Sequence, residues 1–430
     1  MKILVIGSGA REHCLVWKIS QSREADKIFA IPGNAGIAQI AQCENIPLSR
    51  ENFVNILNFI KKNEIDFTVI GPEAPLVDGI VDFLSENGCL AFGPDKGSAQ
   101  IEGSKVFTKK LCSKYGIPTA DAVFFNKSEY SEAAAYINNL SPQKFPYVIK
   151  ADGLAAGKGV IIAKSKTELL EGLEEFFLEN TFGLSGENII IEDFISGFEV
   201  SLLCLCDGDT LIPLEMAQDY KKIFDGDLGK NTGGMGSYSP LPFIEEALYK
   251  KIMNKIIFPT FNALKNEGFI YKGVLYGGII VRDNEPFLLE YNCRFGDPET
   301  QAIIPRLKSD IIPILMSCAL GTLKNIKLEW TEDKSVCVVI ASKGYPQSSC
   351  AGDIIYGLDK IKNSSDIFTF HAGTKNENSE ISTNGGRVLS MVSTGKSFKD
   401  ARIKVYDSIK KVSFNGMQFR KDIALKVEEL

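Results

Sequence analysis

Residues 288–301, LLEYNCRFGDPETQ, guide the interpretation of the whole chain. An apolar run at 287–289 enters this stretch, and a polar turn at 282–286 separates it from an apolar run at 277–281. Two apolar runs joined by a polar turn predict a β-hairpin. Because side chains alternate along a strand, Glu290 and Asn292 are expected on one face. Their carboxylate and amide oxygens suit Mg²⁺ that is held jointly with phosphates.

A positive charge follows this candidate metal site. Arg294 precedes Gly296, Asp297 and Pro298, a turn-forming sequence that ends the strand. A cation beside a metal site suggests that an anionic substrate binds nearby. The alternative is a hairpin that ends in a charged, solvated loop.

The composition is typical of an ordinary globular protein. The chain has 430 residues, of which 44% are apolar and 24% are charged, which predicts about two to four domains. The net charge of −6 does not favour nucleic acid as a partner. No apolar run approaches the ~20 residues that cross a bilayer, and the N-terminus does not read as a signal peptide. A cytoplasmic protein without a membrane partner is expected.

Cysteine and histidine usage disfavours a transition-metal site. The ten cysteines are scattered without a CxxC pair, which predicts buried free thiols. His13 and His371 are the only histidines, so a zinc site built on histidines is not expected. His371 is expected to be a satisfied core or edge residue.

The first hundred residues alternate apolar strands with helical segments, which predicts a parallel sheet. Glycine- and proline-rich loops follow the strands at the edge where such sheets bind ligands. The loop at 7–12 resembles a dinucleotide-binding turn, but Glu12 replaces the third glycine and opposes a pyrophosphate. Arg11 and the glycine amides could hold one phosphate. The alternative is that these loops are only turns.

A glycine-rich hairpin is expected in the middle of the chain. A helix is predicted over 105–115, and a strand at 147–150 ends on Lys150. Residues 151–160, ADGLAAGKGV, lack the helix that follows a P-loop. The bare amides and Lys158 are suited to close over phosphates as a flap. The alternative is a flexible hairpin tip with a solvated lysine.

The next segment is expected to bind a nucleotide. A strand at 188–192 breaks at 193–197 and resumes at 199–203, which exposes backbone groups that can read adenine. Glu199 is placed to accept hydrogen bonds from ribose hydroxyls. Residues 219–237 are predicted to form a polar, glycine-rich loop outside the core.

The last hundred residues begin after a linker at 330–334. Strands are predicted at 335–341, 367–374 and 387–392, and an amphipathic helix at 397–412. The turn before the last of these strands presents Arg387.

These stretches resemble the phosphoribosylamine–glycine ligase family of the ATP-grasp carboxylate–amine ligases. The resemblance is carried by IGSGAREH, PGNAG, GPEAPLVDG, EGSKVFTK, IKADGLAAGKGV, NTGGMGSYSP, EYNCRFGDPETQ and NGGRVL, in one register up to about residue 389. The chain departs from the family pattern at Ala10, where glycine is usual, and at Tyr220 and Lys222, where His and Arg are common.

The resemblance implies an α/β and α+β multidomain fold. A Rossmann-like parallel sheet would span 1–103, an ATP-grasp domain pair 104–322 with a mobile lid at about 121–193, and a small β-rich domain 325–430. The implied reaction joins glycine to 5-phosphoribosylamine through a glycyl phosphate, in de novo purine biosynthesis. ATP is the co-substrate, Mg²⁺ or Mn²⁺ the metal ion, and the protein would be a monomer or weak homodimer.

The resemblance also implies the site residues. Glu290 and Asn292 would hold the metal ion, while Arg294, Asp297 and Lys150 would act in catalysis. The residues expected to bind ATP are Lys105, Lys150, Gly157, Lys158, Gly159, Glu192, Asp193, Phe194, Ile195, Glu199 and Asn231. Those expected to bind the other substrates are Gly9, Arg11, Glu12, Asn34, Pro72, Glu73, Asp219, Arg294, Gly296, Asp297, Pro298 and Arg387. For Arg387, the alternative is a turn arginine in water.

Two other functions stay open. One is an ATP-grasp ligase that acts on a different carboxylate or on bicarbonate. The other is a non-catalytic nucleotide- or NAD-binding protein, which the broken GxGxxG pattern disfavours.

Overall fold

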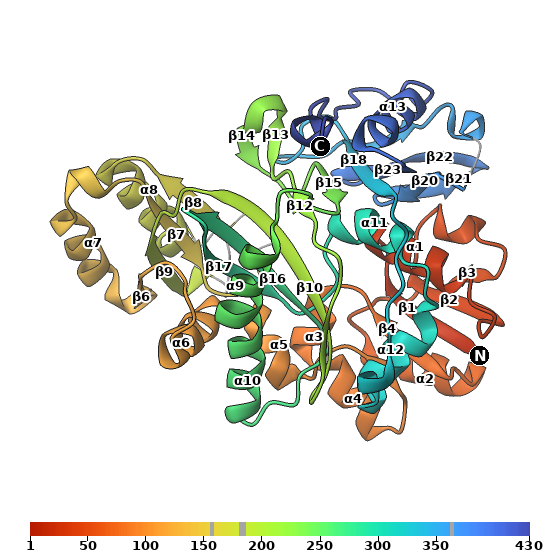
Figure 1. Ribbon diagram of the computed structural model, residues 1–430, viewed down its shortest axis with the longest axis horizontal. Coiled ribbons are helices and arrows are strands. Elements are labelled where there is room, and N and C mark those ends of the chain that lie inside the picture. The colour runs from red at the N-terminus through yellow and green to blue at the C-terminus, as the bar shows by residue number, and fades with distance from the viewer. Residues whose placement is uncertain (155–158, 180–185, 362–364) are drawn as a thin grey trace.

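The computed structural model describes residues 1–154, 159–179, 186–361 and 365–430. Figure 1 shows the N-terminal sheet at the right, the C-terminal strands above it, a long central sheet in the middle and a separate lid at the left.

The N-terminal sheet is parallel throughout, in the order β3-β2-β1-β4-β5, which confirms the prediction. Its strands are β1 (Lys2–Gly7), β2 (Lys27–Pro32), β3 (Cys43–Asn45), β4 (Phe67–Ile70) and β5 (Ala91–Phe92). Its helices are α1 (Ala10–Ile19), α2 (Phe53–Asn63), α3 (Glu73–Asp78), α4 (Ile80–Glu86) and α5 (Lys96–Gly103). Alternate β1 residues pack toward α1 and α2, so both faces of the strand are buried.

The central sheet contains the predicted hairpin. Its order is β11-β10-β16-β17, with strands β10 (Phe198–Asp207), β11 (Leu211–Pro213), β16 (Lys272–Arg282) and β17 (Glu285–Asn292). Asp283 and Asn284 form the tight turn with positive φ angles of 53° and 61°, a conformation that Asn and Asp tolerate. Helices α6 (Lys105–Tyr115), α9 (Glu246–Ile252), α10 (Phe258–Asn266), α11 (Glu299–Ile303) and α12 (Ile311–Leu320) complete this region.

The lid has a hydrophobic core of its own. Its sheet, in the order β6-β9-β7-β8, contains β6 (Ala122–Asn126), β7 (Tyr147–Ala151), β8 (Val160–Ala163) and β9 (Asn188–Asp193). Helices α7 (Tyr130–Asn139) and α8 (Lys166–Phe177) pack on it, and Leu173, Phe176 and Phe177 of α8 are buried there. The lid core is separate from the two larger cores of the chain.

The C-terminal sheet includes two strands from the middle of the chain. Its order is β12-β15-β18-β23-β20, with β12 (Gln218–Asp219), β15 (Gly236–Ser239), β18 (Lys334–Ala341), β20 (Ile367–His371) and β23 (Arg387–Gly395). The remaining elements are β13 (Lys222–Phe224), β14 (Leu228–Asn231), β19 (Ala351–Ile354), β21 (Thr374–Glu377), β22 (Glu380–Asn384) and α13 (Phe398–Ile409). The prediction that residues 219–237 form a loop outside the core is wrong, because they contribute strands and because Met235 and Ser237 are fully buried. Polarity was a misleading signal, because polar residues such as Ser237 pair in the C-terminal sheet and are buried there.

Candidate active site

Glu290 and Asn292 lie at the end of β17. Glu290 is paired with Gly278 of β16, whereas Leu288 is paired with Ile279, so Leu289 is the extra residue of a β-bulge. Such bulges re-aim neighbouring side chains and are frequent beside functional sites. The predicted pair therefore lies just after a bulge at the sheet edge.

Four cations act on the carboxylate of Glu290. Lys221 Nζ lies 3.8 Å from Glu290 Oε1. Partial burial alone would raise the pKa of Glu290, but Lys221, Lys150, Lys105 and Arg294 outweigh this effect and lower that pKa. Three of these cations also pair with other carboxylates: Lys221 with Glu199, Lys150 with Glu192, and Arg294 with Glu73 and Glu102. The sequence analysis gave Lys221 no role. Asp219 was expected to bind substrate, and because side chains alternate along a strand, Lys221 two residues later is expected on the same face.

The oxygen donors fit a metal ion that is shared with phosphates. Within the described ranges, no cluster of three or more His, Cys, Asp and Glu side chains could hold a metal ion. The Glu290 side chain is 41% exposed, and Asn292 Oδ1 accepts a hydrogen bond of 3.0 Å from Arg294 Nη2. Mg²⁺ commonly binds one or two protein oxygens and completes its shell with phosphate and water. The donor set therefore fits a metal ion carried by a nucleotide.

Arg294 is engaged by the protein. Its Nε donates to Glu73 Oε2 at 3.1 Å, and its Nη2 donates to Glu102 Oε1 at 3.0 Å. Its Nη1 donates to the carbonyl of Phe295 at 3.2 Å. Together with the bond to Asn292, these contacts leave one N–H group for a substrate, since a guanidinium has five. Sequence analysis missed Glu102, although it directly precedes the GSK stretch.

Glu73 brings the N-terminal sheet to this arginine. Burial raises the pKa of Glu73, but Arg294 and Arg11 lower it more, to about 2. Pro72 precedes this first residue of α3. The ionised Glu73, at the start of α3, therefore holds Arg294, which follows β17.

The side chain of Glu12 fills the turn after β1. Glu12 Oε2 accepts from the Gly9 N–H at 2.6 Å, and Oε1 accepts from Arg11 Nε at 2.5 Å. A Cβ on Gly7 or Gly71 would lie only 2.3 or 2.2 Å from Glu12 atoms. Glu12 thus occupies the crevice in which a dinucleotide fold places the pyrophosphate, which argues against the NAD-binding alternative.

Asn34 makes its side-chain hydrogen bonds within the protein. Its Nδ2 donates to the carbonyls of Ser8 and His371 at 2.8 and 2.7 Å. Its Oδ1 accepts from the N–H groups of Gly36 and Ile37, each at 2.9 Å. These four bonds use the full capacity of the amide. Asn34 therefore shapes its loop and ties it to β20, rather than offering its side chain to a substrate.

Arg387 is not a turn arginine in water. Its Nη2 lies 3.1 Å from Asp297 Oδ2, and its Nη1 donates to the carbonyls of Asp297 and Gly233 at 2.7 and 2.5 Å. A Cβ on Gly234 would lie 2.4 Å from Pro298 Cδ. The loop before β15, the loop after β17 and the start of β23 therefore meet at one place.

Two acids, buried Glu299 and half-buried Asp219, lie beside this junction. Glu299 Oε1 accepts hydrogen bonds from Tyr276 Oη at 2.5 Å and from Ser201 Oγ at 3.0 Å. Burial and the charge of Glu299 raise the pKa of Asp219 well above its ordinary value. A Cβ on Gly296 would lie 2.5 Å from Glu299 Oε2, so only glycine fits there.

The expected adenine edge lies between β9 and β10. Asp193 ends β9, and its N–H donates to the carbonyl of Asp121 at 3.0 Å. Phe194 is 38% exposed, whereas Ile195 is buried. Glu199, the second residue of β10, pairs with Lys221 at 2.9 Å.

Other predicted ATP ligands are placed in part. Gly157 and Lys158 lie outside the described residues. The carbonyl of Gly159 accepts from the Ala151 N–H at 2.9 Å, and Asn231 is paired with Lys222 in the β13–β14 hairpin.

Tyr220 contacts the C-terminal segment. Its Oη accepts from the Ala424 N–H at 3.0 Å, and the Arg420 guanidinium lies 4.7 Å from its ring centre. The carbonyl of Lys222 also accepts from Arg420. The departures at 220 and 222 therefore lie where the chain terminus packs.

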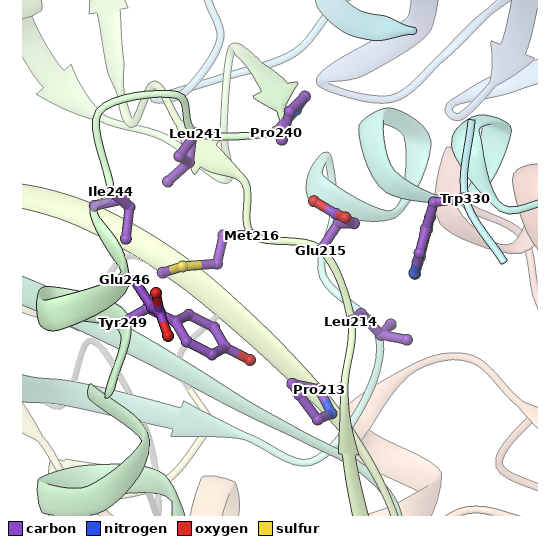
Figure 2. Close-up of a pocket in the computed structure, with 10 residues that line it drawn as sticks. All are labelled: Pro213, Leu214, Glu215, Met216, Pro240, Leu241, Ile244, Glu246, Tyr249 and Trp330. Atoms are coloured by element: carbon purple, nitrogen blue, oxygen red, sulfur yellow. The ribbon is translucent and has the colours of Figure 1, made fainter. Parts of the chain in front are cut away.

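A separate cavity of about 420 Å³ lies beside β10 (Figure 2). It is lined by Pro213, Leu214, Glu215, Met216, Pro240, Leu241, Ile244, Glu246, Tyr249 and Trp330. None of these residues belongs to the set described above.

No helix in the described ranges is both long and apolar enough to cross a bilayer.

Three features together define an ATP-grasp ligase. They are a lid with its own core, lysines from α6 and from the lid, and a carboxylate–amide pair at the end of β17. Family models for phosphoribosylglycinamide synthetase match the N domain at residues 1–102, the ATP-grasp (A) domain at 103–300 and the C domain at 335–426. The chain belongs to the phosphoribosylamine–glycine ligase (phosphoribosylglycinamide synthetase) family.

Full-length relatives agree with these matches. A phosphoribosylamine–glycine ligase of Caldanaerobacter subterraneus is 47% identical over 424 residues, and one of Neisseria meningitidis is 44% identical over 428 residues; each alignment covers 99% of both chains. The crystal structure of phosphoribosylamine–glycine ligase from Thermotoga maritima superposes with a TM-score of 0.84 at 34% identity, covering 98% of this chain and 100% of that one. A biotin carboxylase domain from Hydrogenobacter thermophilus, at 16% identity and a TM-score of 0.74, shares the fold alone.

Proposed function

We propose that this chain joins glycine to 5-phosphoribosylamine at the expense of ATP, and releases glycinamide ribonucleotide, ADP and phosphate. The arrangement of four cations around Glu290, in a chain that matches the family over its whole length, carries the proposal. Members of this ATP-grasp family use ATP and a divalent metal ion.

The residues divide into two groups along the reaction. Lys105, Lys150 and Lys221 bind and orient the triphosphate, so that the glycine carboxylate attacks the terminal phosphate and forms a glycyl phosphate. Glu290 and Asn292 would hold Mg²⁺ or Mn²⁺, which offsets charge on the phosphates when bound. The amine then attacks the acyl carbon and displaces phosphate.

The second group holds glycine and the ribose phosphate. Arg294 offers its remaining N–H group to an anionic oxygen, while Asp297 and Arg387 orient the loop beside it. Arg11 and the loop amides at Gly9 are the proposed contacts for the sugar phosphate. Closure of the lid would keep water from the acyl phosphate.

An ADP-release assay tests this proposal. Release should require ATP, glycine and phosphoribosylamine together, and omission of any one should abolish it. Equal release with bicarbonate or another amino acid in place of glycine would favour a different ATP-grasp ligase. Size-exclusion chromatography tests the monomer or weak homodimer, and replacement of Mg²⁺ by Mn²⁺ tests the metal preference. A cytoplasmic location is part of the same proposal.

A further inference from the structure

Lys109 is a buried lysine with no predicted role. Its Nζ lies 2.7 Å from Glu192 Oε2 and donates to Thr119 Oγ1 and to the carbonyl of Ala120, each at 2.8 Å. Its side chain is 8% exposed. Two of the three N–H groups of this ammonium donate to these oxygens, and its charge pairs with Glu192, so the group is engaged within the protein. Lys109 therefore acts through its neighbours and not by touching a substrate.

Glu192 connects Lys109 to Lys150, which the proposed function assigns to the phosphates. Its second oxygen, Oε1, pairs with Lys150, so the buried Glu192 carboxylate, a residue expected to bind ATP, is engaged by two lysines. Within the described part of the chain, the Lys150 ammonium makes no other hydrogen bond or ion pair. Two ammonium groups around one buried carboxylate carry a net charge of +1.

We infer that Lys109 is a positioning residue that balances the charge of Glu192, so that Lys150 keeps its positive charge available for the triphosphate. Without Lys109, Lys150 and Glu192 would form a neutral pair. A low-dielectric pair of this kind would hold the Lys150 ammonium at the carboxylate and weaken its attraction to phosphate. This inference rests on the proposed function, because that function assigns Lys150 to ATP.

The backbone around Lys109 supports this role. Thr119 Oγ1 donates to the carbonyl of Leu288 at 2.8 Å, and the Leu288 N–H donates to the carbonyl of Pro118 at 2.8 Å. The chain enters the lid directly after these residues, and Glu192 lies where β9 leaves it. Lys109 thus joins the segment that enters the lid, which is bonded to β17, to Glu192 near the end of β9, and keeps Glu192 beside Lys150.

Lys109→Met tests the inference by removing the charge and keeping the length of the side chain. The Kd for a non-hydrolysable ATP analogue, measured by calorimetry, should rise roughly tenfold, which is the effect of one weakened charge contact. The KM for glycine should stay within about twofold. A change in both the Kd for the ATP analogue and the KM for glycine would indicate a general loss of structure instead. Lys110→Met is the matched control: this neighbouring lysine is exposed, and its replacement should leave the Kd native.

The double variant Lys109→Met/Glu192→Gln separates charge balance from packing. It restores a net charge of +1 at Lys150, so its Kd should lie closer to the native value than that of Lys109→Met. A double variant no better than Lys109→Met, or a folded Lys109→Met with native Kd, would overturn the inference.

Two further comparisons separate the inference from a failure of Lys109→Met to fold and from a failure of the proposed function. If Lys109→Met does not fold, the double variant, which leaves no unpaired buried acid, is compared with the native chain. A native-like Kd then supports charge balance, and a tenfold loss refutes it. Because nucleotide binding is measured without turnover, absence of glycine-dependent ADP release from the native chain would refute the proposed function alone.

Discussion

The Arg387 guanidinium lies 3.1 Å from the Asp297 carboxylate, and Arg387 Nη1 donates to the carbonyl of the same residue at 2.7 Å. The side chains are 22% and 15% exposed, so little water screens the pair. This contact joins the start of β23 to the loop after β17. It makes the C-terminal strands part of the site.

Arg387→Met should therefore impair activity as well as stability. An unpaired, mostly buried Asp297 costs about 2–3 kcal/mol, and kcat/KM for phosphoribosylamine should fall at least roughly tenfold. ADP release and urea unfolding measure the two effects. Lys396→Met is the control, since Lys396 pairs with Asp333 but is 89% exposed. Equal effects of both substitutions would contradict a role of Arg387 in the site.

Glu290→Gln should abolish turnover without unfolding the chain. The substitution removes the carboxylate that four cations surround, and kcat should fall at least about a hundredfold, because metal-ion charge stabilisation is worth several kcal/mol. Circular dichroism should show a native fold. Glu285→Gln, on the same strand and paired with Lys251 and Lys255, should keep kcat. Full activity of Glu290→Gln would refute the metal assignment.

Arg294→Ala should raise the KM for glycine or lower kcat sharply. It removes the donor to Asn292 and the ion pairs with Glu73 and Glu102, leaving Glu73 with Arg11 at 3.9 Å and Glu102 with the Cys293 N–H, and kcat/KM should fall about a hundredfold, as for other buried ion pairs. Steady-state kinetics with glycine as the varied substrate measure this. Arg282→Ala, an exposed arginine over Phe287 on the same hairpin, is the comparison. An unchanged kcat/KM for glycine would exclude Arg294 from that site.

His371 should make stability depend on pH. Burial lowers its pKa from 6.5 to about 4, so the unfolded chain binds more protons than the folded one between these values. Stability is full above pH ~6.5 and is lost as the pH falls toward 4, by roughly 3 kcal/mol from 1.4 kcal/mol per pH unit. Urea unfolding at pH 7, 6, 5 and 4.5 should show this slope, and His371→Gln should reduce it. If the free energy of unfolding depended on pH identically in His371→Gln, His371 would be excluded as the source of the dependence. His13, also buried with a lowered pKa, adds to the slope in the same direction.

Local patterns were sufficient for much of the fold. Alternation of apolar strands and helices predicted the parallel sheet, and the turn at Asp283 and Asn284 predicted the hairpin. Patterns failed at residues 219–237, where the strands are only two to four residues long and rich in polar residues. They also missed Lys109, although its position one helical turn after Lys105 was a signal that both share a face of α6.

The sequence by itself determined the family, the order of the elements and the oxygen pair on β17. Only the tertiary structure decided which charges meet. It paired Arg387 with Asp297, bonded Asn34 to β20, and divided Glu192 between two lysines. The physical reason is that periodicity reports which face of an element is buried, whereas a charge contact depends on how distant elements pack together.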